Sequence, residues 1–528
     1  MQPIASPLAG VKHWFREDIE EPAIAFLGGP ARFKVIVLLA CVLGLDGADK
    51  ATIGAIAVKL EQALHISNLQ VGLLVTASTA IGVFAILPLG ILADRVKRVR
   101  LLTAAVVVWS LAMAVSGFSI SYAMLLFTRL ALGAIVATAA PVVASLIGDF
   151  FQPAERGRIF GFILTGELLG VAFGFLMSGS VADFFTWRTP FWILAAIGLA
   201  LAVALYVLLP EPARGGQSRI ALGANEFDAA ADTSIDASSG KADDEREEDQ
   251  VEEEIEEAGI KPDPRRVPAV DPARLSWPRA VRYILSIRTN VLIIVASALG
   301  YFYLAGLETF GVVYMHGRFD LSQSAASATL VASGIGAIVG VLLVGRLSDR
   351  LIEHGHYRAR IWTGAAAFFV AALFLLPGFL SGSLYATGIL FFIGALGLGG
   401  VNPPMGAAQL DIMHSRLWGR AESILSSLRY AFVAIAPLIF GYLSTVFGGT
   451  AHPLGPTLGK AIQNNAVGLG LTLAVMLATL IGAGIALLLA LRSYPRDVAT
   501  AHAFEDKTRE LSQQESSSID NDSRLRLE

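Results

Sequence analysis

The chain has 528 residues, of which 54% are hydrophobic and 16% are charged. A soluble protein of this size carries about a quarter charged residues, so the composition excludes an ordinary soluble domain. The formal net charge of −4 averages an acidic segment with basic loops, and no basic and aromatic patch indicates nucleic-acid binding. Cys41 is the single cysteine, so no disulfide can form within the chain.

Apolar runs of about 20 residues recur along the chain, and each is long enough to cross a hydrocarbon core of ~30 Å. They cover residues 33–57, 69–90, 101–119, 122–148, 159–181, 190–209, 289–315, 324–345, 361–380, 384–409, 421–447 and 466–491. We therefore expect an all-α membrane protein with twelve transmembrane helices in two bundles. The first bundle covers residues 33–210 and the second covers residues 281–492.

The first span contains three charged residues, Asp46, Asp49 and Lys50, at a spacing that places them on one helix face. Inserting an ionisable group into the hydrocarbon costs at least ~2.5 kcal/mol of free energy, so each of these residues requires a structural or functional explanation. Arg129 in the fourth span lies at a similar depth to Asp49, and we expect these two to pair with Lys50 close by. Either the charges neutralise one another and lock the spans together, or an aspartate exchanges a proton and gates the outer half.

A charged hairpin over residues 90–100 joins the second and third spans, with four basic residues in its last six positions. The positive-inside bias places this hairpin at the cytoplasmic face. Gly90 allows two backbones to approach closely, and Asp94 can accept hydrogen bonds from a helix end or from an arginine.

The fifth span combines a row of glycines with one carboxylate. Gly166, Gly170 and Gly174 form a small face that allows close helix contact. Glu167 is offset by one position from that face and lies ~13 Å from the cytoplasmic end, near the midplane. Its own span has no basic residue, so we expect it to stay protonated until a cation or a cationic substrate approaches. The alternative is a protonated side chain bonded to a neighbouring backbone carbonyl.

Residues 211–280 interrupt the apolar pattern. From residue 241 to 258 there are eleven acidic residues against two basic ones, and such a segment buries too little apolar surface to fold alone. We expect a largely disordered cytoplasmic linker, with a regulatory or partner-binding segment as the alternative. A basic stretch then returns the chain to the anionic cytoplasmic leaflet. Residues 1–32 and 493–528 are expected to be cytoplasmic ends.

The second half contains candidate cavity residues in its first and fourth spans. Tyr301, Tyr303 and Glu308 lie in the seventh span, where Tyr301 and Glu308 share a face suited to the polar side of a cavity. The tenth span breaks at Asn402, which two prolines follow, and the carbonyls freed there are tolerated only inside protein or beside water. Asn402 therefore either lines the path or marks a structural kink.

Two motifs occur once in each half. The pattern G-x-L-[AS]-D-R stands at residues 90–95 and again at 345–350, each time after an apolar run. A proline, an aspartate and a Gly-Arg pair recur with identical spacing at residues 141–158 and 403–420. The hairpin motif that occurs in both halves resembles the signature loop of the major facilitator superfamily of transporters, whereas a single copy could be a generic basic loop. The resemblance implies two six-helix halves in the same orientation, related about an axis along the membrane normal.

The resemblance to this family implies that the two hairpins form a cytoplasmic latch between the halves. The latch would be formed while the cavity faces outward and broken while it faces inward, with the substrate near the midplane. The candidate latch residues are Gly90, Asp94, Arg95, Arg98, Asp149, Arg158, Gly345, Asp349, Arg350, Asp411 and Arg420.

A closer resemblance concerns the first and fourth spans. The run from Asp49 to Thr52 resembles the Asp-Arg-Tyr-Thr element of Spinster-type transporters, and Arg129 with Gly133 is similar to their fourth span. That resemblance implies transport of lysophospholipids or sphingosine phosphate coupled to protons. Lys50 replaces the family's arginine, and Val136 stands where a glutamate is expected. The acidic function has therefore either moved to Glu167 or is absent.

We expect a secondary transporter that works by alternating access and couples to protons. Few polar residues line the spans, which favours a hydrophobic or amphipathic small molecule, such as a lysolipid, over a sugar. A multidrug or organic-anion exporter and a transport-derived membrane sensor are the alternatives. The sequence shows neither a catalytic cluster nor a Walker loop, so we expect no enzyme, no cofactor and no metal. We further expect a monomer in the plasma membrane, with the bilayer, protons and the small molecule as its partners.

Overall fold

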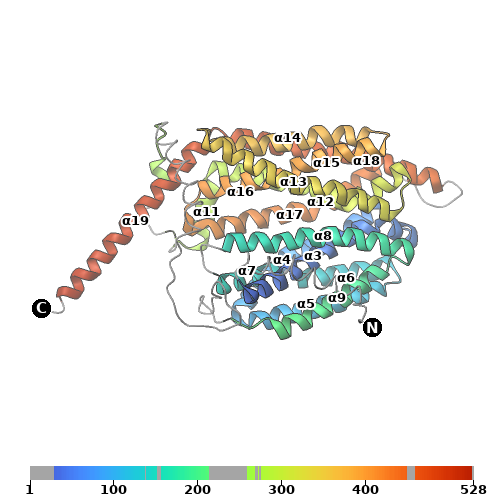
Figure 1. Cartoon of the computed structure of the whole chain (residues 1–528), viewed down its shortest axis with the longest axis horizontal. Helices are drawn as coiled ribbons and strands as arrows, with labels where there is room; N and C mark the ends of the chain where they lie inside the picture. The colour runs from blue at the N-terminus through green and yellow to red at the C-terminus, as the bar shows by residue number, and fades with distance from the viewer. Residues whose placement is uncertain are drawn as a thin grey trace, which may run out of the picture. The chain divides into compact units, whose positions relative to one another are not determined.

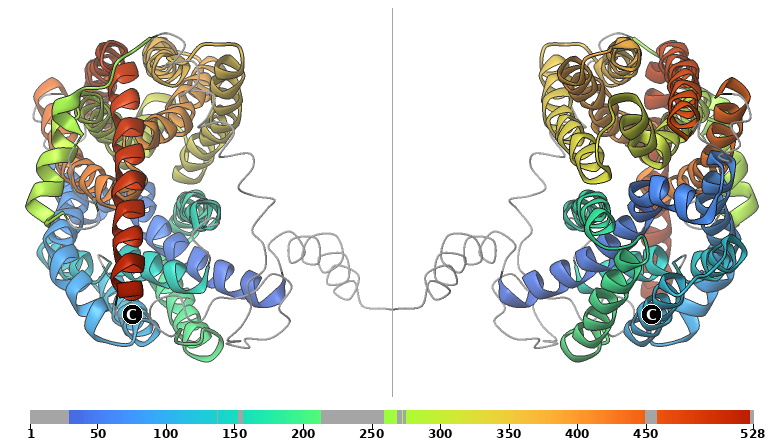
Figure 2. Two further views of the ribbon diagram at one scale, coloured as in Figure 1. Left: turned by 90° about the vertical axis from the view of Figure 1, so that its left-hand side faces the viewer. Right: turned by 90° about the vertical axis from the view of Figure 1, so that its right-hand side faces the viewer.

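The structure, a computed structural model, describes residues 29–136, 138–151, 156–212, 259–267, 272, 275–448 and 458–525. The acidic run over residues 241–258 and most of the N-terminal segment lie outside the described residues. The chain divides into two units, one of Met1–Ile66 with Ala77–Gly240 and the other of Ser67–Thr76 with Lys241–Glu528. The boundary passes through α4 (Asn68–Arg95), whose first residues belong to the second unit. Figures 1 and 2 show the long helices of each unit running side by side.

Within its described residues, the first unit contains the rest of α4 and six further helices. These are α3 (Pro30–Leu64), α5 (Arg98–Gly117), α6 (Tyr122–Val136), α7 (Ala139–Phe150), α8 (Arg156–Phe184) and α9 (Thr189–Leu208). The sequence predicted one span over residues 122–148, and the structure builds this segment from two consecutive helices, α6 and α7. The first stretch of helix ends at Val136, and Thr138 directly precedes the second.

The second unit contains the remaining elements. They are η3 (Pro264–Arg266), α11 (Trp277–Ser286), α12 (Arg288–Phe319), α13 (Gln323–Glu353), α14 (Ala359–Leu380), α15 (Leu384–Gly400), α16 (Asn402–Asp411), η5 (Ser415–Leu417), α17 (Trp418–Gly448), α18 (Leu458–Ala490) and α19 (Tyr494–Leu525). The break predicted at Asn402 is confirmed, since α15 ends at Gly400 and α16 begins two residues later. The prolines that follow Asn402 have no N–H to donate to the preceding turn.

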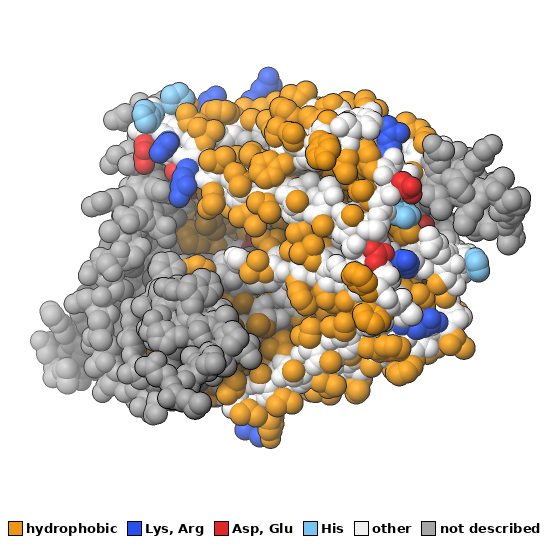
Figure 3. All heavy atoms as spheres, turned by 45° about the vertical axis from the view of Figure 1, so that its right-hand side comes forward, with side chains coloured by type: hydrophobic (Ala, Val, Ile, Leu, Met, Phe, Trp, Pro, Cys, Tyr) orange, Lys and Arg blue, Asp and Glu red, His pale blue; other side chains and the backbone are white. Residues whose placement is uncertain are grey.

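Ten helical stretches of the described chain are long and apolar enough to cross a membrane. The segment α3 is longer than any of them but carries Asp46, Asp49 and Lys50 in its middle, and the α6–α7 segment is interrupted. Together these make the twelve spans of an all-α membrane protein. On the face that Figure 3 shows, hydrophobic side chains cover most of the middle, and charged side chains lie mainly toward its edges. Such a continuous apolar surface is expected of a protein that faces lipid.

A seam of small residues holds α3 against α8. A Cβ atom on Gly170 would lie 1.9 Å from the carbonyl oxygen of Gly44, and one on Gly166 would lie 2.6 Å from that of Ala40. A side chain at either position would therefore overlap the backbone of the neighbouring helix. The close helix contact predicted from the glycine row is confirmed, and α3 is the partner. This seam fixes which residues of α3 and α8 face each other.

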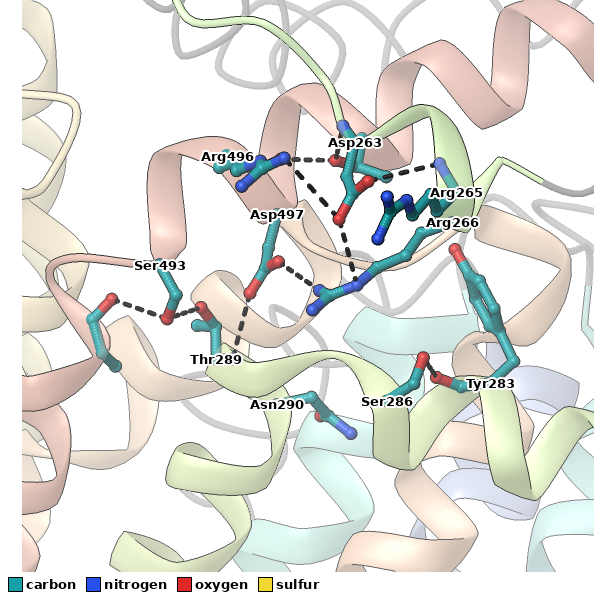
Figure 4. Close-up of polar contacts among 12 residues, drawn as sticks. Asp263, Arg265, Arg266, Tyr283, Ser286, Thr289, Asn290, Ser493, Arg496 and Asp497 are labelled. Carbon is teal, nitrogen blue, oxygen red and sulfur yellow. Dashed lines mark hydrogen bonds and ion pairs between the residues drawn. The ribbon is translucent and has the colours of Figure 1, made fainter.

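The final helix, α19, is tied to the start of the second unit by the polar network that Figure 4 shows. Asp497 is buried and accepts a hydrogen bond from Arg266 at 2.8 Å and another from the backbone N–H of Thr289 at 3.0 Å. Asp263 lies 3.6 Å from Arg266 and 3.7 Å from Arg496. The network joins three segments, namely the stretch before α11, the first turn of α12 and the first turns of α19.

Candidate functional site

A buried ion pair joins α3 to α6 in the first unit. Nη1 of Arg129 lies 2.7 Å from Oδ1 of Asp49, and the two side chains are 2% and 7% exposed. The guanidinium also lies over the ring of Phe191 at 5.1 Å and contacts the sulfur of Met113. The pairing predicted from the depth of the two residues in their spans is therefore present. Arginine does not lose its proton in proteins, so this pair is suited to holding helices together.

A second charged cluster lies at the α3–α8 seam. Nζ of Lys50 lies 2.6 Å from Oδ2 of Asp46 and 2.9 Å from Oε1 of Glu167. The expectation that Glu167 waits for an approaching cation is wrong, because Lys50 of the neighbouring helix already provides one. The prediction placed Lys50 beside Asp49, but its ion partners are Asp46 on its own helix and Glu167 across the seam.

The two clusters differ in what they can do chemically. The Lys50 side chain is 44% exposed, so water and protons can reach its cluster, whereas the pair of Asp49 and Arg129 is closed. One ammonium group faces two carboxylates, which gives the cluster a net charge of −1 when both carboxylates are ionised. Either carboxylate can accept a proton while the other keeps the lysine paired.

The end of each unit that holds Arg98 or Arg360, here called the basic end, contains a matched Arg–Asp pair. In the first unit Arg98 pairs with Asp149 on α7 and donates to Oγ of Ser145 at 3.0 Å. Glu211, just beyond α9, accepts hydrogen bonds from the first backbone N–H groups of α5, at 2.7 Å and 2.9 Å. These groups have no partner within their helix, so Glu211 caps α5 beside the Arg–Asp pair.

In the second unit Arg360 pairs with Asp411, again 51 residues apart as in the first unit. Tyr494 of α19 is fully buried and donates its hydroxyl to the other oxygen of Asp411. Burial and the negative charge of Asp411 raise the pKa of Tyr494 well above its usual value, so the hydroxyl keeps its proton. Thus a residue just beyond the last span of each half completes the pair in that half.

Other latch candidates lie apart from these pairs. Arg420 donates to the backbone carbonyl of Leu275 at 3.0 Å, and its own-half aspartate pairs instead with Arg360. Gly345 faces Pro403 of α16, while Asp349 is half-buried and Arg350 is exposed near the end of α13. The side chains of Asp94, Arg95 and Arg158 and the surroundings of Gly90 lie outside the described part of the structure.

The second unit brings together two of the four predicted cavity residues. The hydroxyl of Tyr301 on α12 lies 3.3 Å from Oδ1 of Asn402 on α16, and Asn402 is exposed. Tyr303 is instead 0% exposed and packs against Phe440, so it belongs to the core and its placement in a cavity is wrong. Glu308 is half-buried about two turns further along α12 than Tyr301.

Arg429 of α17 completes this cluster and was missed from the sequence. Its guanidinium lies 4.5 Å from the centre of the Tyr301 ring and 5.7 Å from that of Tyr430. An arginine inside the apolar run over residues 421–447 was the available signal. Among the described residues no group of three or more His, Cys, Asp and Glu is arranged to hold a metal ion.

The sequence profile of the Major Facilitator Superfamily matches residues 39–437. The 4-hydroxybenzoate transporter PcaK of Pseudomonas aeruginosa is 30% identical over 185 residues, which are 35% of this chain and 41% of that protein. The probable L-galactonate transporter of Escherichia coli is 28% identical over 197 residues, 36% and 43% of the two chains. The chain thus matches about two fifths of the length of these curated relatives.

Two solved structures share the fold. A bacterial homologue of the human lysosomal transporter Spinster, inward-facing and occupied, superposes with a TM-score of 0.68 and 19% identity, covering 89% of this chain and 98% of that one. A point mutant of the nucleoside transporter NupG gives a TM-score of 0.57 and 12% identity, covering 87% and 100%. The profile spans most of the transmembrane segments, and these structures share the helical architecture. The chain therefore belongs to the Major Facilitator Superfamily of membrane transporters.

Proposed function

We propose that this chain is a proton-coupled secondary transporter of an amphipathic organic acid that works by alternating access. The observation that carries the proposal is the cluster of Asp46, Lys50 and Glu167, in which a half-exposed lysine holds two carboxylates from two helices. Charges inside a membrane span are expensive and mark ion or proton pathways. This cluster is charged, accessible and built across a helix seam.

The unequal numbers of acids and bases in the cluster support the proposed proton coupling. With one ammonium and two carboxylates, a proton can bind without leaving any charge unpaired. Protonation of Glu167 would weaken the link that Lys50 makes from α3 to α8, so occupancy by a proton can bias the arrangement of these helices. The alternative role, a structural lock between helices, fits the pair of Asp49 and Arg129 better, because that pair is balanced in charge and buried.

The substrate class is inferred from the relatives and from the composition of the spans. The relatives' names refer to 4-hydroxybenzoate, L-galactonate and other acids. Spans with few polar side chains suit a molecule with a large apolar part better than a polyhydroxylated one, which favours an aromatic acid among these. A lysolipid is the second candidate, since the Spinster homologue shares the fold. The two classes have in common an anionic group beside an apolar body.

We propose further that the protein lies in the plasma membrane and that the basic end of each unit faces the cytoplasm. The loops after the second, fourth, eighth and tenth spans carry most of the loop arginines and lysines. Both termini and the acidic linker are then cytoplasmic, and a monomer suffices for transport. In the same proposal the Arg–Asp pairs of Arg98 and Arg360 belong to the cytoplasmic latch.

Proteoliposomes containing the purified chain test the coupling. Glu167→Gln should abolish accumulation driven by a proton gradient but preserve exchange of labelled substrate, because exchange requires no net proton movement. Asp183→Asn is the matched control, since Asp183 is also on α8 and pairs with a lysine of α3, Lys59, at 3.8 Å. It should retain both activities. Normal accumulation by the Glu167→Gln protein would refute the assignment of the proton to this cluster.

A further inference from the structure

Three helices of the second unit converge on Arg429. Tyr301 comes from α12, Asn402 from α16 and Arg429 from α17. At ~1.5 Å per residue, all three lie about 14–20 Å along their helices from the basic end. That distance is about half of the ~30 Å thickness of a hydrocarbon core. The cluster therefore lies near the middle of these membrane-spanning segments.

Arg429 has little compensation for its charge at this depth. Within the described part of the chain it donates one hydrogen bond, to Oγ of Ser426 at 3.2 Å, and it forms one ion pair, with Glu422. That pair has a separation of 4.0 Å and the Glu422 side chain is 57% exposed, so it is weak. A guanidinium has five N–H donors. Most of the hydrogen-bonding capacity of Arg429 therefore remains available.

Arg429 is accessible and flanked by aromatic rings. Its side chain is 20% exposed, and the guanidinium stacks on Tyr301 and lies near Tyr430. Stacking of this kind orients the planar fork of the guanidinium and stabilises it in an apolar setting. On the other side of Tyr301, the hydroxyl is held by Asn402, whose amide is exposed.

We propose that this cluster binds the carboxylate of the transported molecule, and that the molecule is an aromatic monocarboxylate. The inference rests on the proposed transport function and specifies its substrate. Arg429 pairs with the carboxylate through two parallel hydrogen bonds, which is the geometry that distinguishes arginine from lysine. Tyr301 and Tyr430 pack against the aromatic ring. Asn402 and the hydroxyl of Tyr301 bind a polar substituent of that ring. A single arginine matches a singly charged carboxylate better than a doubly charged phosphate.

Equilibrium binding to the purified full-length chain in nanodiscs tests the proposal, with 4-hydroxybenzoate as the probe. Its uncharged analogue 4-hydroxybenzamide should bind at least about tenfold more weakly, because a charge-assisted hydrogen bond is lost. Arg429→Gln should weaken 4-hydroxybenzoate binding by about tenfold to a hundredfold and weaken 4-hydroxybenzamide binding less, because the amide carries no charge. Arg279→Gln, which alters an exposed arginine on α11, is the control and should bind both as wild type does.

Two further variants keep the test decisive. If Arg429→Gln does not fold, Arg429→Lys retains the charge but loses the paired hydrogen bonds, and it should still weaken 4-hydroxybenzoate binding by about tenfold. Tyr301→Phe should weaken 4-hydroxybenzoate more than benzoate, because it removes the hydroxyl beside the ring substituent.

Equal affinity of the wild type for the acid and the amide would overturn the proposal, as would an unchanged affinity in both Arg429 variants. If the wild type binds a lysophospholipid and no aromatic acid, this inference fails. The proposed proton coupling is tested separately, by the Glu167→Gln accumulation assay. Failure of the substrate assignment and failure of the proton coupling are therefore distinguishable.

Discussion

Removing the carboxylate of Asp49 should destabilise the first unit strongly, because it leaves the guanidinium of Arg129 buried without a counter-ion. The pair is only 2% and 7% exposed, with a separation of 2.7 Å. Breaking such a pair from one side costs about 3–5 kcal/mol. For a folding unit of about 200 residues, this corresponds to a fall in melting temperature on the order of 10 °C. Asp49→Asn should therefore impair folding, and accumulation and exchange should decline together.

A double-mutant cycle separates the pair from its surroundings. Asp49→Asn combined with Arg129→Gln removes both charges, and it should recover most of the stability that the single variant loses. Thermal unfolding of the purified proteins in detergent measures all members of the cycle. Asp183→Asn provides the less buried counterpart, with a looser pair at 3.8 Å, and should cost less than about 1 kcal/mol. The reasoning is refuted if the free energy of unfolding of Asp49→Asn lies within about 1 kcal/mol of the wild-type value. It is also refuted if the double variant is no more stable than the single one.

Three further predictions concern other parts of the chain. Gly170→Val should separate α3 from α8, because even a Cβ atom would lie 1.9 Å from the backbone of Gly44; loss of both stability and transport is expected, and a fully active, equally stable variant would contradict the seam. Burial raises the pKa of Tyr283 to about 12, whereas the unfolded chain titrates near 10. The native state thus holds the Tyr283 proton more tightly, and the free energy of unfolding should fall between pH 10 and 12 by up to about 2–3 kcal/mol. The melting temperatures of the wild type and Tyr283→Phe should diverge over this range, because the variant lacks the titrating hydroxyl; parallel melting curves would contradict this role of Tyr283. Cysteines placed at residues 241–258, after removal of Cys41, should react only with membrane-permeant maleimides in intact cells, and labelling by an impermeant reagent would reverse the proposed orientation.

The positions of the spans could be predicted because they depend on local hydrophobicity and length. Predicted and observed ends differ by a few residues in most helices, as in α9 (Thr189–Leu208) against residues 190–209. The interruption between α6 and α7 was missed, although residue 141 is a proline that cannot donate to the carbonyl of residue 137. The corresponding proline at residue 403 was correctly taken as a break. The same physical rule, applied at both positions, would have found both interruptions.

Contacts between helices were predictable only where depth alone decided them. Asp49 and Arg129 could be paired because both are charged residues at one level of the membrane. The partner of Glu167 depended on which helix packs against α8, and a glycine row indicates a close neighbour without identifying it. Once α3 is known to be that neighbour, Lys50 can be identified as the ion partner of Glu167. Arg429 required only that its charge be noticed within an apolar run, and its tyrosine partners required the fold.

The network around Asp497 brings the beginning and the end of the second unit's chain together. Asp263 and Arg266 precede the first helices of that unit, and they bond to Thr500 and Asp497 of its last helix. The second half is thus closed on itself by contacts of its own, independent of the peptide connection that precedes it. A gene divided within the codons for residues 241–258 should consequently yield two polypeptides that assemble when co-expressed. A fusion partner at the C-terminus would be carried by a helix anchored at its first turns.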